Sequence, residues 1–164
     1  GVRNNYILEL QEGRDQFYRS SHKRSIKKAI KAKTELRAIS IKEFLTFFKS
    51  HNPYFNQDIL PHFRKFTQLI EYAYNNKHGI PTATFIDGEM TACIFWGIQE
   101  SRAYYLFPAV NKRGKESGST HYLIDQVQEL IPEAKIIDFM EEMQVATGNN
   151  HIILTTLKGN NLGA

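Results

Sequence analysis

The sequence predicts an α/β (α+β) fold, in which helices flank a mixed sheet built around a central antiparallel meander of three strands. Three apolar runs with strand-like composition follow one another closely, at 81–86, 90–98 and 103–109. Asp87-Gly88 between the first two runs is a strong hairpin signal, so these strands should be antiparallel. A helix over 119–131 leads to a last strand at 134–139, which a right-handed crossover should place parallel to the third strand and beside it.

Length and composition limit the class of protein. The 164 residues fit a single domain, 1–164, with an N-terminal strand and basic helix (1–33), a core (34–139) and an atypical tail (140–164). No apolar run approaches the roughly 20 residues of a membrane span, and no signal peptide opens the chain, so we expect a cytoplasmic protein. The single cysteine, Cys93, suits a core strand, and the histidines show no ligand spacing, so we expect no metal site.

The net charge of +4 is concentrated near the N-terminus, where nine basic residues between Arg14 and Arg37 face only two acids. The pattern predicts a strand at 6–10 and a helix over 15–32. The narrow apolar face of this helix would consist of Tyr18, Ile26, Ala29 and Ile30. Basic residues cover the remainder, either as a solvated face or as a surface for an anionic partner.

Two more helices should precede the meander. After a strand at 34–39, Ser40 and Glu43 predict a capping box for a helix over 41–49. Pro61 suits the first turn of the next helix, which runs to about Asn76 and buries an apolar stripe. The polar stretch 51–59 between these helices is either a substrate-side loop or a simple connection.

The stretch 111–120, between the third meander strand and the next helix, predicts an anion site. Its glycines let the backbone approach a phosphate, its hydroxyls and N–H groups donate hydrogen bonds, and the start of a helix is electropositive. The residues expected to contribute are Lys112, Arg113, Gly114, Lys115, Ser117, Gly118, Ser119 and Thr120. The alternative is a solvent-exposed basic turn in which Ser117 or Ser119 is the helix N-cap.

Four segments carry a resemblance to a known family: Arg24–Ala29 (RSIKKA), Phe85–Trp96 (FIDGEMTACIFW), Tyr104–Gly118 (YYLFPAVNKRGKESG) and Ile136–Phe139 (IIDF). In order and spacing, 25–139 resembles the GNAT superfamily of N-acyltransferases, and most closely the second GNAT-like domain of Fem-type peptidoglycan aminoacyltransferases. The resemblance implies transfer of an acyl group from acyl-CoA, such as acetyl-CoA, to a small-molecule or peptide amine. Lys115–Thr120 is similar to the Q/R-x-x-G-x-G/A loop that holds the coenzyme A pyrophosphate in that family, with Lys in the first position and Thr in the last.

The resemblance also implies which groups would act in acyl transfer. In GNAT enzymes a bulge in the third meander strand offers N–H groups to the thioester carbonyl; Pro108 marks the expected break, with Phe107 or Ala109 as the donor. The candidate bases and acids are Glu89, Asp138, Tyr104, Tyr105 and Tyr122, of which Glu89, Tyr105 and Asp138 form the predicted catalytic group. Each also has a plainer interpretation, as a turn carboxylate, a core or rim aromatic, or a buried polar group.

The C-terminal segment departs from the Fem-type pattern and leaves rival functions open. The helix expected after Phe139 is absent, 151–157 suits one more strand, and the first Fem-type domain is missing. We therefore expect a fragment or single-domain relative whose ending was replaced, for instance by a reading-frame change. If the ending is genuine, we expect a sheet completed by the tail or by a second subunit in a homodimer, with doubtful activity. The rivals are a Fem-type transferase that binds aminoacyl-tRNA through the basic helix 19–33, and a catalytically silent GNAT-like binding module.

Overall fold

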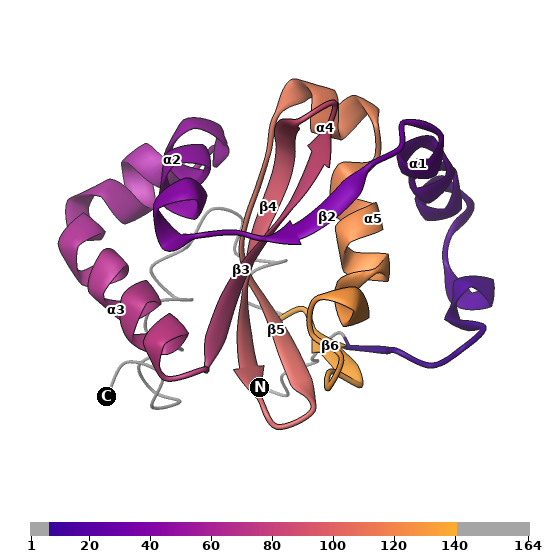
Figure 1. Ribbon diagram of the computed structural model, residues 1–164. Helices are drawn as coiled ribbons and strands as arrows, with labels where there is room; N and C mark the ends of the chain where they lie inside the picture. The colour runs from indigo at the N-terminus through magenta and orange to yellow at the C-terminus, as the bar shows by residue number, and fades with distance from the viewer. Residues whose placement is uncertain (1–6, 141–164) are drawn as a thin grey trace, which may run out of the picture.

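The computed structural model describes residues 7–140, which form a mixed sheet with helices on both faces (Figure 1). The strands are β1 (Ile7–Glu9), β2 (Glu35–Ala38), β3 (Gly79–Ile86), β4 (Glu89–Gln99), β5 (Arg102–Val110) and β6 (Ile136–Asp138). The α-helices are α1 (Ser20–Lys31), α2 (Ile41–His51), α3 (Phe63–Asn75), α4 (Lys112–Glu116) and α5 (Ser119–Asp125). Shorter helical turns lie at Arg14–Phe17, Phe55–Ile59, Leu60–His62 and Val127–Glu129. The strand and tail predicted beyond Met140 lie outside the described residues.

The sheet has the strand order β1-β6-β5-β4-β3-β2, and the predicted fold class is confirmed. The meander β3-β4-β5 is antiparallel, and β6 pairs with β5 in parallel, both as predicted. Asp87 and Gly88 have positive φ angles of 51° and 79°, which suit the two central positions of a tight hairpin turn. The edge strand β1 pairs with β6 and widens the sheet on that side.

Helices α2 and α3 cover one face of the sheet with an aromatic core (Figure 1). The rings of Phe66 and Phe107 meet edge to face, with centroids 4.9 Å apart. The capping box of Ser40 and Glu43 is confirmed at the start of α2. The stretch 51–59 connects α2 to α3 through a helical turn, whose residues Phe55 and Ile59 are buried in this core.

Helices α1 and α5 cover the opposite face (Figure 1). The predicted continuous helix 15–32 is wrong, because the chain is extended at Tyr18 and Arg19 between a short turn and α1. This break lets the Tyr18 hydroxyl donate a hydrogen bond to Asp125 at the end of α5, over 2.8 Å. Ile30, expected in the apolar face, is 59% exposed. The helix expected over 119–131 ends at Asp125 and continues as a shorter helical turn.

A β-bulge interrupts the pairing of β4 and β5. Phe95 lies opposite Phe107 and Trp96 opposite Tyr105, so Leu106 is the extra residue on β5. Leu106 and Phe107 consequently both enter the core under α2 and α3. The break expected at Pro108 is wrong, since Pro108 keeps its place opposite Ile94.

The parallel pairing of β5 and β6 is short. It covers only Arg102 to Tyr104 on β5, whereas β5 continues to Val110. Within residues 7–140, no other strand pairs with this edge of β5 beyond Tyr104. The described helices include none long and apolar enough to cross a membrane.

Candidate functional site

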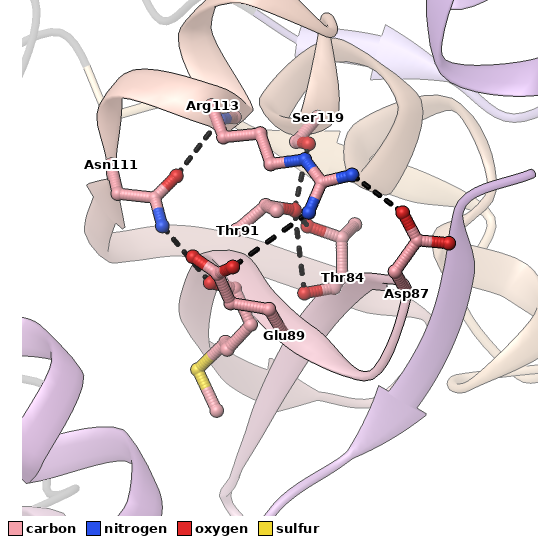
Figure 2. Close-up of polar contacts among 9 residues, drawn as sticks. Thr84, Asp87, Glu89, Thr91, Asn111, Arg113 and Ser119 are labelled. Atoms are coloured by element: carbon pink, nitrogen blue, oxygen red, sulfur yellow. Dashed lines mark hydrogen bonds and ion pairs between the residues drawn. The ribbon is translucent and has the colours of Figure 1, made fainter. Parts of the chain in front are cut away.

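The predicted anion loop at 111–120 is mostly helical. Asn111 caps α4, because its side-chain oxygen accepts the N–H of Gly114 over 2.8 Å (Figure 2). Its side-chain amide donates to the Met90 carbonyl over 3.0 Å and so fixes α4 to the start of β4. The composition of this stretch suggested an open loop, but a well-placed Asn cap converts its first half into a helix.

The two glycines of this stretch serve packing. A Cβ atom at Gly114 would collide with the carbonyl oxygen of Thr91 on β4. Gly118 has a left-handed φ of 67°, and a Cβ atom there would collide with the backbone of Ser25 on α1. Both glycines are therefore explained by close approach of protein backbone rather than by approach of a phosphate.

Ser119 is fully buried, and its hydroxyl belongs to an internal hydrogen-bond chain. It lies 2.8 Å from the hydroxyl of Thr91, which lies 2.8 Å from that of Thr84 (Figure 2). Ser117 and Thr120, on either side, are half-buried. The structure therefore positions Ser119 to join α5 to the sheet.

The basic side chains of α4 differ in their availability. Arg113 pairs with Asp87 over 2.7 Å and with Glu89 over 3.7 Å, so two carboxylates of the β3–β4 hairpin already face it (Figure 2). Lys112 and Lys115 are exposed, with no ion-pair partner in the described part of the chain. These two lysines are the positive charges that α4 presents to solvent.

The predicted catalytic group does not converge. Asp138 lies opposite Tyr104, which lies opposite Gly97 on β4, and Glu89 is eight residues from Gly97. At about 3.3 Å per strand residue, Glu89 lies roughly 26 Å from Asp138 along the sheet. Glu89 is therefore not part of a common site with Asp138 and Tyr105.

Asp138 and Tyr105 also face opposite sides of the sheet. Asp138 is 4% exposed and pairs with Arg102 over 3.0 Å, while its other oxygen accepts the N–H of Met140 over 2.9 Å. Tyr105 contacts Trp96 and Phe139 on the side of α5. The geometry thus gives Asp138 the contacts of a buried, satisfied carboxylate.

The three candidate tyrosines share one property. Burial raises the pKa of Tyr104, Tyr105 and Tyr122 above the ordinary value for a tyrosine. Each phenol therefore stays protonated at neutral pH and can serve as a hydrogen-bond donor or acid, but not as a base. Tyr104 lies on the α2 and α3 side of β5 and Tyr105 on the other.

Asn52 is a residue of this region that the sequence did not single out. It follows α2, and its side-chain amide donates a hydrogen bond to the Pro108 carbonyl over 2.9 Å. That contact gives the Pro108 carbonyl a side-chain partner and joins the end of α2 to β5. No sequence signal marks a lone Asn at a helix end as a partner of a strand 56 residues away.

Cys93 lies in the core, as predicted. It is completely buried on β4, and burial raises the pKa of its thiol, so the thiolate needed for nucleophilic attack is disfavoured. Within residues 7–140, no group of three His, Cys, Asp or Glu side chains is arranged to hold a metal ion.

Comparison with known protein structures identifies the fold. No family model and no curated protein matches the sequence. FemX matches with a TM-score of 0.66 at 9% identity, over 83% of this chain and 52% of FemX. A conserved protein of unknown function from Bacteroides thetaiotaomicron matches with a TM-score of 0.60 at 9% identity, over 92% of this chain and 54% of its own. A possible acetyltransferase from Clostridium difficile matches with a TM-score of 0.50 at 13% identity, over 73% of this chain and 88% of its own.

The chain spans about half the length of FemX and of the Bacteroides protein. At these identities the matches establish a common fold and leave the chemistry open. The sheet order, the parallel β5–β6 pair and these matches agree with the expected resemblance. The protein has the GNAT-like fold, in the form that it shares with FemX and with the acetyltransferase-like structure.

Proposed function

We propose that this chain is an N-acyltransferase domain that moves an acyl group from acyl-CoA to an amine on a small molecule or peptide. The observation that carries the proposal is the edge of β5 from Tyr105 to Val110. This edge has no strand partner among residues 7–140 and adjoins the bulge at Leu106. In this proposal the acyl chain lies along this edge, as the GNAT resemblance implies. The donor class also implies a cytoplasmic location.

The bulge supplies the chemical reason for this choice. Acyl transfer from a thioester needs an N–H donor aimed at the carbonyl oxygen, where negative charge develops. A bulge frees backbone groups from the regular ladder, and Phe107 flanks the extra residue Leu106, whereas Ala109 keeps its regular place opposite Cys93. We propose that the Phe107 N–H polarises the carbonyl while the amine nitrogen bonds to the carbonyl carbon and the C–S bond breaks. Tyr105, beside the bulge, donates its proton to the leaving thiolate and regains a proton from the nitrogen of the new amide, so that the enzyme is restored.

The phosphates of the donor would lie over α4. The exposed Lys112 and Lys115 supply charge there, and Arg113 can add to it by exchanging its carboxylate partners for a phosphate. Gly114, Gly118 and Ser119 already contact other parts of the protein, so in this proposal they hold α4 and α5 in place and do not contact the phosphates. This arrangement predicts a donor site that depends more on side-chain charge than on a backbone cradle.

The test is calorimetric titration of acetyl-CoA into the protein and into the Lys112→Ala/Lys115→Ala variant. The loss of two charge-assisted contacts should weaken binding by about tenfold or more. An Arg64→Ala/Lys65→Ala variant removes an exposed basic pair from α3 and should bind as the wild type does. Absence of acetyl-CoA binding to the folded wild type would contradict the donor assignment, and equal binding by both variants would contradict its location.

A second candidate is an aminoacyl-tRNA-dependent transfer of the Fem type, which the surface of α1 favours. This helix has no acid in its first turn and presents a row of exposed basic residues: Lys23, Arg24, Lys27, Lys28 and Lys31. A contact with nucleic acid phosphates would weaken steeply as salt is added. Fluorescence anisotropy with tRNA, using Lys27→Glu/Lys28→Glu as the variant, distinguishes this candidate from acyl-CoA binding. Binding of neither donor would favour the silent module.

A further inference from the structure

A cavity of about 490 Å³ lies between the edge strand β1, the N-terminal part of α1 and the helix α5. Its floor is apolar, with Leu8, Ile26, Ile124 and Phe139 among the side chains that line it. Phe17, at its rim, is 70% exposed. A cavity of this size with a mostly apolar lining is in the range that holds small organic molecules.

The polar part of the lining contains Arg19, His22 and His121, of which Arg19 supplies the positive charge. No carboxylate in the described residues pairs with Arg19. The imidazole rings of His22 and His121 lie 4.5 Å apart between centroids. The first turn of α1, which contains His22, has no acidic residue and no side-chain cap. An anionic group would therefore meet favourable charge at this end of the cavity.

The one acid in the lining, Asp125, is already satisfied. It accepts the Tyr18 hydroxyl over 2.8 Å and the Gln126 amide over 2.7 Å, and Arg14 lies 3.8 Å from it. Burial and the hydrogen bond to Asp125 raise the pKa of Tyr18 to about 12, so this phenol remains protonated and keeps donating. Asp125 is thus held at one wall by its hydrogen bonds, and the nearby Arg14 offsets part of its negative charge.

We propose that this cavity binds a small carboxylate with an apolar body, such as a medium-chain fatty acid. The hydrocarbon part lies against Ile26, Ile124 and Phe139, and the carboxylate faces Arg19 and His22. The cavity is distinct from the phosphate site proposed on α4, because no α4 residue lines it. It lies on the same side of β5 as the unpaired edge, and Phe139 in its lining contacts Tyr105 at 5.5 Å between ring centroids. Its occupant would join α1 to the body of the domain.

Titration of octanoate, followed by calorimetry and by NMR of the histidine side chains, tests the proposal. Octanoate should bind and shift the signals of His22 and His121, whereas octan-1-ol should bind at least tenfold more weakly and octylamine should not compete. Binding of all three with similar affinity would overturn the carboxylate preference and leave only a non-specific apolar surface. No binding of octanoate at millimolar concentration would overturn the site itself.

A pair of variants, one directly before α1 and one within it, locates the carboxylate. Arg19→Gln should weaken octanoate binding about tenfold, because it removes the unpaired guanidinium from the cavity. Arg24→Gln, on the exposed side of α1 and outside the lining, should leave octanoate binding unchanged. Both positions are exposed, so both variants should fold. Equal affinities of the two variants would contradict the placement of the carboxylate.

Discussion

On the face covered by α2 and α3, the sheet is packed with rings, whereas the face covered by α1 and α5 combines apolar packing with buried hydrogen bonds and a cavity. Phe44, Phe48 and Phe66 are fully buried on the first face. On the second, Trp96 donates to Thr82 over 2.9 Å, and the hydroxyls of Thr84, Thr91 and Ser119 form a continuous chain. In the close-packed aromatic core, a void of even a few atoms lowers stability. On the other face, each buried hydrogen bond fixes the relative position of the two residues that it joins.

This difference suggests a division of roles. The aromatic face stabilises the fold and holds the bulged β5 in place through Phe107. The other face holds α4 and α5 by specific polar contacts and close glycine packing, and it contains the apolar cavity beside α1. Variants on the two faces should therefore lose stability for different reasons, and the following predictions compare them from the largest effect to the smallest.

Removal of a core ring should have the largest effect. Phe66→Ala leaves a void among Phe48 and Phe107, so the free energy of unfolding should fall by about 3–5 kcal/mol in urea denaturation. Phe17→Ala is the control on the other face, since Phe17 is 70% exposed, and it should change the free energy by less than about 0.5 kcal/mol. A comparable loss in both variants would contradict the distinction.

Gly118→Ala tests the close packing of α1 against α5. The positive φ of 67° and the collision with the Ser25 backbone should together lower the free energy of unfolding by about 2–4 kcal/mol. Gly88→Ala is a matched control, because Gly88 has a similar φ of 79° but open space around it. The free energy of unfolding of Gly88→Ala should fall by only about 1 kcal/mol, the cost of the positive φ alone. Equal losses would mean that backbone conformation alone makes glycine necessary at Gly118.

Thr91→Val tests the buried hydroxyl chain. The substitution keeps the shape but leaves the hydroxyls of Thr84 and Ser119 without their shared partner, and should lower the free energy of unfolding by about 1–3 kcal/mol. Thr67→Val is the matched control on α3, since the buried Thr67 hydroxyl has no hydrogen-bond partner. That variant should be neutral or more stable than wild type. If only Thr67→Val destabilised the protein, the Thr67 hydroxyl and not the Thr91 hydroxyl would be the stabilising group.

Removal of the carboxylates that pair with Arg113 should strengthen acetyl-CoA binding at the proposed donor site. Asp87→Asn/Glu89→Gln removes the carboxylates that face Arg113 and keeps a residue that tolerates the positive φ at Asp87. Because exposed ion pairs are weak, stability should change by less than about 1 kcal/mol while acetyl-CoA binding tightens by up to about fivefold. Weaker binding in calorimetry would indicate that the hairpin carboxylates hold Arg113 in its productive position.

The smallest effect concerns pH. Burial, followed by the proximity of His22, lowers the pKa of His121 below its ordinary value of 6.5. The unfolded chain then binds this proton more readily than the folded one, so stability should fall as pH decreases through about 6.5 towards the lower folded-state pKa. Melting temperatures between about pH 8 and pH 5 should show a shallower dependence in His121→Gln than in wild type. Parallel curves would assign the dependence to other groups.

Local signals predicted the elements whose causes are local. Asp87-Gly88 specified the hairpin, Ser40 and Glu43 specified the start of α2, and the apolar stripe of α3 has the expected buried side. The Asn111 cap was also readable, since its partner is only three residues away, but α4 is too short to show helical periodicity. The sequence placed the basic segment correctly at the end of β5 but did not predict that its first half is helical.

Long-range contacts determined what the sequence could not show. Gly118 is necessary because of Ser25 on another helix, Arg113 is occupied by a hairpin before β5, and Asn52 bonds to Pro108 across 56 residues. The predicted catalytic group does not converge for the same reason, because Glu89, Tyr105 and Asp138 were chosen by residue type. Strand register then placed Glu89 at the far end and the other two on opposite faces.

The sequence by itself determined the element types, the antiparallel meander and the crossover that makes β6 parallel to β5, because turn chemistry, periodicity and chirality act over a few residues. Only the tertiary structure decided that the extra residue of β5 is Leu106, that β5 and β6 separate after three pairs, and that the glycines of 111–120 serve packing. These features depend on contacts between residues that are far apart in the chain. The free energy of such a contact depends on both segments, so neither segment alone predicts it.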